Sequence, residues 1–268
     1  MQYIDCQKYA QEILDEVKAI PNKKTLVIIT VGDDMASQSY VKGKIKDCEY
    51  CGVPVIHTKF DPTVSKEWDV VDYIRQCNKS TSIGGIIVQL PLPEGWNEEV
   101  LTMTVDRDKD VDGFRPLSKF KPCTPEGIMY VLHKELGDLT GKDALVIGRG
   151  KLVGKPIAQM LLDEDCTVTV AHSKTKYLIE LLEPTDIVIS AVGKANFLDS
   201  SYFTNTELVI DVGINRDEND KLCGDVDSTD FNKYLQETYL TPVPGGVGLL
   251  TRLTLMENVI YSCKINSN

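Results

Sequence analysis

Short apolar runs alternate along this chain with segments of helical periodicity. The predicted strands are residues 25–32, 53–60, 84–90, 143–148, 167–171, 186–193 and 207–213. The predicted helices are residues 5–19, 36–51, 65–78, 125–136, 154–163 and 249–263. Runs rich in valine and isoleucine suit strands covered on both faces, and their alternation with helices is typical of βα units. The sequence therefore predicts an α/β fold with largely parallel sheets.

The pattern changes near LGDLTGK, residues 136–142, where a compact strand–turn–helix–strand series begins. A chain of 268 residues is long enough for two domains. We predict an N-terminal α/β substrate domain at 1–139, completed by 241–268, and a nucleotide-type α/β domain at 140–240. A cleft between two such domains is where a cofactor and a substrate would meet.

Composition narrows the class of protein. The formal net charge of -11 disfavours nucleic acid or an anionic membrane as the main partner. No apolar run approaches the roughly 18 residues that span a bilayer, and the first twenty residues lack the features of a leader peptide. We therefore expect a cytoplasmic protein.

The eight cysteines are scattered, and only Cys48 and Cys51 form a CxxC pair. No second ligand pair follows, so we predict no metal site. The pair also closes a predicted helix just before Gly52, whereas a thioredoxin-like motif should open one. We expect reduced, mostly buried thiols.

A glycine-rich turn separates a predicted buried strand from an apolar helix. Gly148, Gly150 and Gly154 give the spacing G-x-G-x-x-x-G. Such glycines let backbone N–H groups approach a pyrophosphate at the start of the helix. The alternative is a βα turn that is merely tight.

The next predicted strand indicates which dinucleotide is preferred. Proteins that bind NAD carry an acid at the end of this strand, where this chain has His172 and Ser173. With Arg149 in the glycine turn, this arrangement suits a 2′-phosphate and favours NADP. The alternative is that His172, Lys174 and Lys176 are ordinary loop residues.

Two further strand ends carry glycines. Gly193 and Gly213 end the predicted strands 186–193 and 207–213. We expect their backbone to close over a nicotinamide ring.

The stretch SYVKGKIK, residues 39–46, raises the question of which lysine does chemistry. Helical spacing predicts a core face of Val41, Ile45 and Cys48 and a solvated face of Lys42, Lys46 and Glu49. Tyr40 and Lys44 lie four residues apart, on the border beside the core face. A partly buried lysine loses its proton more readily than one in water and can move protons. The alternative is a surface lysine whose stem covers apolar neighbours.

Two other segments end in polar residues. Gln89 lies at the end of the predicted buried strand 84–90, and polar groups at the carboxyl ends of parallel strands face the ligand crevice. Asp110 and Asp112 lie in KDVDGF, which on its own is also an ordinary acidic turn.

Taken together, these segments resemble the bifunctional methylenetetrahydrofolate dehydrogenase/methenyltetrahydrofolate cyclohydrolase family. The matching stretches are VGDDMASQSYVKGKIKDCEYCGV, GGIIVQLPLP, KDVDGF, KPCTPEGI, GRGKLVGKP, HSKT, DVGIN and TPVPGGVG. They run in family order across nearly the whole chain. The resemblance implies oxidation of methylenetetrahydrofolate by NADP and hydrolysis of the methenyl product to 10-formyltetrahydrofolate, in a homodimer of one-carbon metabolism.

The resemblance also implies residue roles. Lys44 is expected to transfer protons in the hydrolysis, Tyr40 to pack against the pterin and Gln89 to hold Lys44. Asp112 would accept two hydrogen bonds from the guanidine-like edge of the pterin, a charge-assisted bidentate pair. The folate contacts would include Pro244, Gly245 and Gly246. The cofactor contacts would be Gly148, Arg149, Gly150, Gly154, Ser173, Gly193 and Ile214.

The chain departs from the family pattern at three places. Gly150 stands where a serine is usual, Leu249 and Leu250 stand where proline and methionine are usual, and RPLSKF replaces a longer stretch after Asp112. These changes touch the expected cofactor and folate walls. Two rival functions are therefore a cyclohydrolase with weak or lost dehydrogenase activity and a folate-binding protein without turnover.

Overall fold

The computed structural model describes residues 2–229 and 238–265 of the chain. The chain divides into two compact units. The first unit comprises Met1–Ala10 and Thr124–Thr251, and the second comprises Gln11–Cys123 and Arg252–Asn268. The domain limits at residues 140 and 240 stay a prediction.

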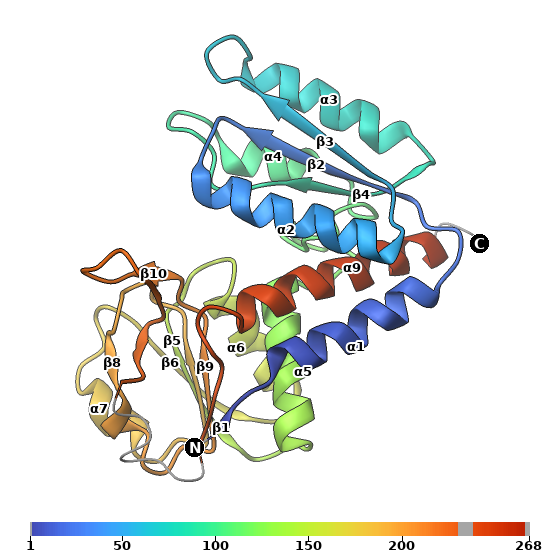
Figure 1. The fold of residues 1–268 in the computed structure, drawn as a ribbon. Helices are drawn as coiled ribbons and strands as arrows, with labels where there is room; N and C mark the ends of the chain where they lie inside the picture. Colours follow the sequence, from blue (N-terminus) through green and yellow to red (C-terminus); the bar gives the residue numbers. More distant parts are fainter. Residues whose placement is uncertain (1, 230–237, 266–268) are drawn as a thin grey trace. The chain divides into compact units, whose positions relative to one another are not determined.

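A three-stranded parallel sheet forms the centre of the second unit. Its order is β3 (Val55–Phe60), β2 (Thr25–Val31) and β4 (Ile83–Val88). The helices of this unit are most of α1 (Cys6–Ala19), α2 (Met35–Cys51), α3 (Glu67–Lys79), α4 (Glu98–Thr104) and the second part of α9 (Val247–Ile265). Figure 1 shows α2 and α3 on opposite faces of the sheet.

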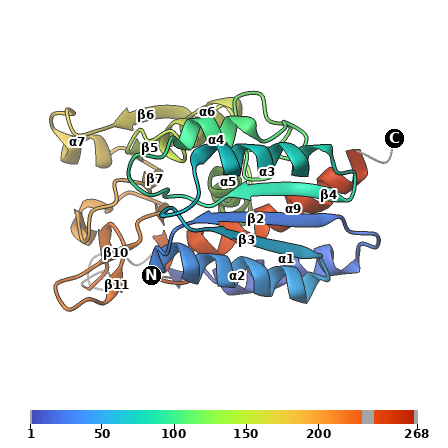
Figure 2. The ribbon, with the colours of Figure 1, turned by 90° about the horizontal axis from the view of Figure 1, so that it is seen from above.

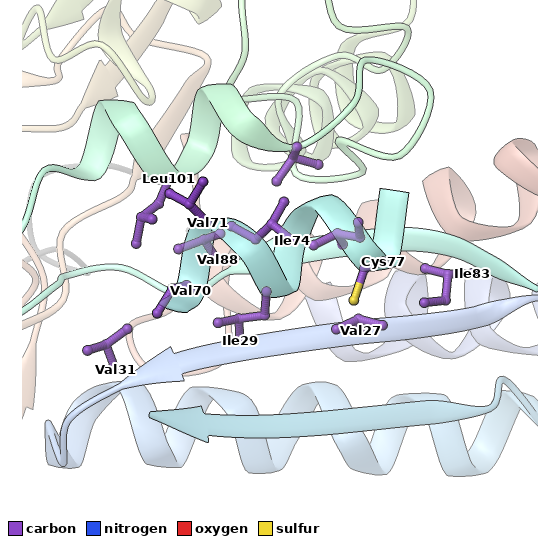
Figure 3. Close-up of a cluster of buried hydrophobic side chains, with 12 residues drawn as sticks. Val27, Ile29, Val31, Val70, Val71, Ile74, Cys77, Ile83, Val88 and Leu101 are labelled. Atoms are coloured by element: carbon purple, nitrogen blue, oxygen red, sulfur yellow. The ribbon is translucent and has the colours of Figure 1, made fainter. Parts of the chain in front are cut away.

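Alternation along β2 builds the core of this unit. Val27, Ile29 and Val31 point to the face that α3 and α4 cover, where they meet Ile74 of α3 and Leu101 of α4 (Figure 3). All five side chains are buried. Because successive strand residues point to opposite faces, the other residues of β2 are left for the face on which α2 lies.

Helix α2 begins and ends with defined caps. The carboxylate of Asp34 accepts a hydrogen bond from the Ser37 backbone N–H at 2.7 Å, and Gly52 ends the helix in the left-handed conformation at φ 67°. The cysteine pair at 48 and 51 therefore closes a helix, as the sequence predicted.

A six-stranded parallel sheet forms the centre of the first unit. Its order is β1 (Gln2–Tyr3), β13 (Tyr239–Leu240), β9 (Leu208–Asp211), β7 (Ile187–Ser190), β5 (Asp143–Ile147) and β6 (Thr167–Ala171). The helices of this unit are α5 (Cys123–Leu136, which it contains from Thr124), α6 (Gly154–Asp163), α7 (Leu178–Leu182), a 3₁₀ turn at Ser200–Tyr202 and the first part of α9. Figure 2 shows α6 beside β5 and β6.

The strand order reverses at β5. Its chain neighbour β6 lies on one side and β7 lies on the other. A Cβ on Gly148, which follows β5, would lie 2.3 Å from the carbonyl oxygen of Ala191, which follows β7. Such a switch point is where open α/β sheets bind ligands, outside the carboxyl ends of their strands.

The predicted α/β fold and its seven strands and six helices are confirmed, with ends shifted by a few residues at most. The sequence did not predict the short helices α4 and α7. It also missed β1, β13 and two small strand pairs, β8 (Leu198–Asp199) with β12 (Val226–Asp227) and β10 (Asn215–Arg216) with β11 (Leu222–Cys223).

Two further expectations concern thiols and membranes. Among the cysteines whose side chains the structure describes, all are free, and all but the half-buried Cys223 are buried. Within residues 2–229 and 238–265, no helix has the length and apolar character needed to cross a membrane.

Candidate active site

Lys44 is buried in the second unit, where it meets three predicted site residues. Its side-chain ammonium donates to Gln89 Oε1 at 3.2 Å, lies 3.9 Å from Asp112 Oδ2 and sits 5.1 Å from the centre of the Tyr40 ring. Lys44 is only 3% exposed and Asp112 only 6%. The structure therefore brings together Tyr40, Lys44, Gln89 and Asp112.

The position of Lys44 corrects the prediction for α2. The sequence placed Lys44 on the border and Ile45 in the core, but Lys44 is buried and Ile45 is only half-buried. Val41 and Cys48 are buried as predicted, and Lys42, Lys46 and Glu49 are exposed. The buried stripe is rotated toward Lys44 because a carboxylate and an amide satisfy its ammonium group there.

Gln89 is oriented by the chain next to it. Its Nε2 donates to the carbonyl oxygen of Leu90 at 2.7 Å, which leaves Oε1 to accept from Lys44. Leu90 precedes Pro91 in a cis peptide bond, at the carboxyl end of β4. The orientation of this amide therefore depends on the turn that ends the strand.

Asp112 is held through the backbone around it. Its carbonyl oxygen accepts from the Cys123 N–H at 3.3 Å, and the carbonyl oxygen of Val111 accepts from Asn258 Nδ2 at 2.9 Å and from Cys123 Sγ at 3.2 Å. Asn258 and Cys123 were not predicted. They carry no periodic or strand-end signal that could have revealed their contact with this turn.

Asp110 has a separate role in the same turn. Its carboxylate accepts from the backbone N–H groups of Phe114 at 3.4 Å and Arg115 at 2.9 Å. Burial raises the pKa of Asp110 to about 6, against the lowering effect of these hydrogen bonds. Asp110 therefore stabilises the loop, while Asp112 faces Lys44.

A cavity of about 180 Å³ adjoins this group of residues. Gln89 lines it, together with Ser37 and Lys42 of α2 and with His57 and Lys59 of β3. Gln89 thus contacts both the cavity and Lys44. The volume accommodates several water molecules beside polar partners.

The glycine turn of the first unit has the geometry that a dinucleotide site requires. Gly148 adopts φ 113°, and a Cβ on Gly154 would lie 2.3 Å from the carbonyl oxygen of Gly148. A Cβ on Gly150 would meet open space, and Arg149 is exposed. The first and third glycines therefore serve the tight turn between β5 and α6, and the second leaves its backbone accessible.

The end of β6 lies beside this turn. The Gly148 N–H donates to the carbonyl oxygen of Ala171 at 2.9 Å, and Ser173 is exposed two residues further on. His172 Nδ1 accepts from the Lys174 N–H at 3.1 Å, so this histidine shapes the loop. The exposed Arg149 and Ser173 fit a 2′-phosphate, with no carboxylate at this strand end.

The ends of β7 and β9 complete the switch point. Gly193 is exposed with φ 66°, and Ile214 is 64% exposed. Gly213 is buried, and a Cβ there would lie 2.3 Å from Asp225 Oδ1, while its contact with a nicotinamide ring stays a prediction. Gly213 thus makes room for a buried carboxylate.

Pro244, Gly245 and Gly246 lie in the first unit, whereas Lys44, Gln89 and Asp112 lie in the second. Gly245 adopts φ 98° after the cis bond of Val243 to Pro244.

Leu250 is one of the departures from the family pattern. It is 1% exposed, and a Cβ on Gly127 would lie 3.1 Å from the Cβ of Leu250. This leucine is therefore a core residue within its own unit.

These features define a class of protein: an α/β enzyme with a dinucleotide-type unit and a second unit that buries a lysine against a carboxylate and an amide. Two family models match the chain. The catalytic domain of tetrahydrofolate dehydrogenase/cyclohydrolase matches residues 4–112, and the NAD(P)-binding domain of the same family matches residues 122–267. The chain belongs to the tetrahydrofolate dehydrogenase/cyclohydrolase family.

Individual relatives agree with this assignment. The bifunctional protein FolD of Lachnoclostridium phytofermentans is 42% identical over 97% of both chains, and that of Bacillus subtilis is 41% identical over 96% of this chain and 93% of its own. The crystal structure of FolD from Campylobacter jejuni has a TM-score of 0.93, 38% identity and 99% coverage of both chains. A Trypanosoma brucei FolD, complexed with NADP and an inhibitor, has a TM-score of 0.92, 27% identity and coverage of 100% of this chain and 98% of its own.

The predicted family, fold class and enzyme class are confirmed, and the matched NAD(P)-binding domain agrees with the predicted nicotinamide dinucleotide cofactor. The roles of individual site residues stay predictions, although the structure brings the four residues around Lys44 together.

Proposed function

We propose that this chain oxidises 5,10-methylenetetrahydrofolate with NADP and hydrolyses the resulting methenyl compound to 10-formyltetrahydrofolate. The observation that carries the proposal is the buried Lys44, held between Gln89 Oε1 and Asp112 Oδ2. Lysine side chains are rarely buried, since removing an ammonium group from water is costly in free energy. The burial of Lys44 against two polar partners therefore indicates a functional role. The bifunctional relatives support the same pair of reactions.

Hydrolysis requires a proton to move between water and a folate nitrogen. Lys44 would carry that proton, while Gln89 fixes the position of its side chain and Tyr40 offers an aromatic face to the pterin. Asp112 would accept from the adjacent N–H donors of the pterin ring. The neighbouring cavity, which Gln89 lines, would supply water.

Oxidation requires a bound dinucleotide more than acid–base groups. NADP, when bound, supplies the hydride acceptor. The backbone of Gly148 and Gly150 and the start of α6 would hold its phosphates, and Arg149 and Ser173 would hold the 2′-phosphate. Gly193 and Ile214 would contact the nicotinamide end.

The proposal is tested by following two absorbance changes separately. One assay supplies methylenetetrahydrofolate with NADP, or with NAD in parallel, and the other follows the decay of methenyltetrahydrofolate alone. We expect both reactions, with NADP used more efficiently than NAD. Methenyl decay without nucleotide reduction would support the cyclohydrolase with lost dehydrogenase activity, and folate binding without either reaction would support the binding protein.

We also propose that the enzyme is a cytoplasmic homodimer. Free buried thiols fit a reducing compartment. Strand β3 is at one edge of its three-stranded sheet, and its Ile56 is 46% exposed, which gives an edge that a second copy could cover. Sedimentation equilibrium near micromolar concentration should give twice the chain mass, and a single-chain mass there would contradict the dimer.

A further inference from the structure

We propose that Asp225 is a positioning residue for the dinucleotide, because its buried carboxylate holds the turn after β7 and the segment after β9 in the shape that the cofactor contacts. This inference rests on the proposed function, since it concerns the cofactor site of the dehydrogenase reaction. Asp225 is 0% exposed and was not among the predicted site residues.

The single carboxylate of Asp225 accepts five hydrogen bonds. Oδ2 accepts from Ser190 Oγ at 3.0 Å and from the N–H groups of Val192 at 2.9 Å and Gly193 at 3.3 Å. Oδ1 accepts from the Lys194 N–H at 2.9 Å and from Asn215 Nδ2 at 2.9 Å. Five donors converging on two oxygens fix the turn in a single conformation.

The residues held in this way include two predicted cofactor contacts. Gly193 receives its conformation from a turn in which three consecutive N–H groups point at Asp225. Ile214 directly precedes Asn215, whose amide bonds the other oxygen. One buried carboxylate therefore links the ends of β7 and β9, beside the switch point at Gly148.

A second carboxylate fixes Asp225 itself. Asp211, at the end of β9, accepts from the N–H groups of Gly213, Asp225 and Val226, each at 2.9 Å. Two glycines leave room for these two buried carboxylates. A Cβ on Gly213 would lie 2.3 Å from Asp225 Oδ1, and a Cβ on Gly224 would lie 1.9 Å from Asp211 Oδ2.

The test is Asp225→Asn in the full chain, with NADP affinity and both activities measured. An amide cannot accept on its nitrogen, so two or three of the five donors lose their acceptor in either orientation. We expect the Kd for NADP, measured by calorimetry, and the KM for NADP to rise about tenfold or more. Cyclohydrolase activity should stay within about twofold of the parent, because Lys44, Gln89 and Asp112 belong to the other unit.

Asp227→Asn is the matched control. Asp227 lies two residues further on and its carboxylate accepts from the Thr229 N–H at 3.0 Å, away from the turn. We expect parental Kd and KM values for NADP in this variant. Parental NADP affinity in Asp225→Asn, with only a lower Tm, would overturn the inference and leave a purely structural carboxylate.

Milder variants decide the matter if Asp225→Asn does not fold. Ser190→Ala and Asn215→Ala each remove one of the five donors, and we expect the Kd for NADP to rise about threefold in each, with cyclohydrolase activity kept. Unchanged affinity in both would overturn the inference. If the parent itself binds no NADP saturably, the proposed function fails, which is a result distinct from parental affinity in the variants.

Discussion

Lys44 is the residue on which the hydrolytic reaction depends in our proposal. Lys44→Met keeps an apolar stem of similar length and removes the group that moves the proton. We expect cyclohydrolase activity to fall about 10²- to 10⁴-fold, the range for removal of a general acid–base group. Methenyltetrahydrofolate decay, corrected for the uncatalysed rate, measures it.

Lys46→Met is the matched control, since Lys46 lies on the same helix with its side chain exposed. This variant should keep parental activity. Saturable NADP binding in Lys44→Met would show that the unit with the dinucleotide turn remains folded, and a parental Tm would show the same for the unit that holds Lys44. Undiminished cyclohydrolase activity in Lys44→Met would contradict the role assigned to Lys44.

The raised pKa of Asp110 predicts that the free energy of unfolding depends on pH. Burial raises its pKa to about 6 in the folded chain, from 3.8 without the protein environment. Between these values the folded chain holds a proton that the unfolded chain has lost. The contribution of Asp110 to the free energy of unfolding is therefore present below about pH 4 and lost as the pH rises through about 6.

Asp110→Asn removes this titration. We compare the free energy of unfolding of the variant with that of the parent at each pH. We expect the difference, variant minus parent, to be about 2 kcal/mol larger at pH 7 than at pH 4. Urea unfolding at several pH values measures the difference, with Asp72→Asn as the exposed control. A difference that does not change with pH would show that Asp110 has an ordinary pKa.

At the scale of the element, α2 contains a glycine that helix propensity disfavours. A Cβ on Gly43 would lie 1.9 Å from Nη1 of Arg252, and Arg252 Nε lies 3.0 Å from Asp47 Oδ2. The guanidinium group of α9 therefore crosses α2 at Gly43 to reach a largely buried carboxylate. This contact joins the two helices beside Lys44.

Gly43→Ala should destabilise the chain even though alanine favours a helix by about 1 kcal/mol. The new methyl group displaces Arg252 and leaves Asp47 buried without its partner, so we expect a net loss of about 1–3 kcal/mol in the free energy of unfolding. In an Arg252→Ala background the same substitution should become stabilising. Denaturant unfolding of the four chains in this cycle tests it, and an effect of the same sign in both backgrounds would disprove the contact.

At the scale of the whole molecule, cofactor binding should stabilise the folded state. A ligand that binds only the folded chain adds about 2.7 kcal/mol to the free energy of unfolding at a concentration of one hundred times its Kd. We expect NADP to raise the Tm by several degrees and NAD, at the same concentration, to raise it less. Thermal unfolding monitored by circular dichroism measures both shifts.

Arg149→Ala should remove most of the difference between the two nucleotides. Arg149 is exposed in the glycine turn, so its loss should cost little stability without ligand. Lys151→Ala, two residues further on and also exposed, is the control. Equal shifts with NADP and NAD in the parent would contradict the assigned preference.

The sequence by itself determined the alternation of strands and helices, because hydrophobic periodicity and glycine caps act over a few residues. It also identified Gln89 and the turn at Gly148, since the carboxyl ends of parallel strands meet at one edge of a sheet, whereas Asp112 followed only from the resemblance to a family. Tyr40 and Lys44 followed from helical spacing and from the resemblance to a family.

Only the tertiary structure decided how deeply Lys44 is buried. Helical spacing placed it at the border, but its ammonium group finds its partners on β4 and in the turn at Asp112. The five donors around Asp225 and the reach of Arg252 past Gly43 likewise join segments far apart in the chain. Such contacts leave no periodic signal, because each depends on which elements the fold places side by side.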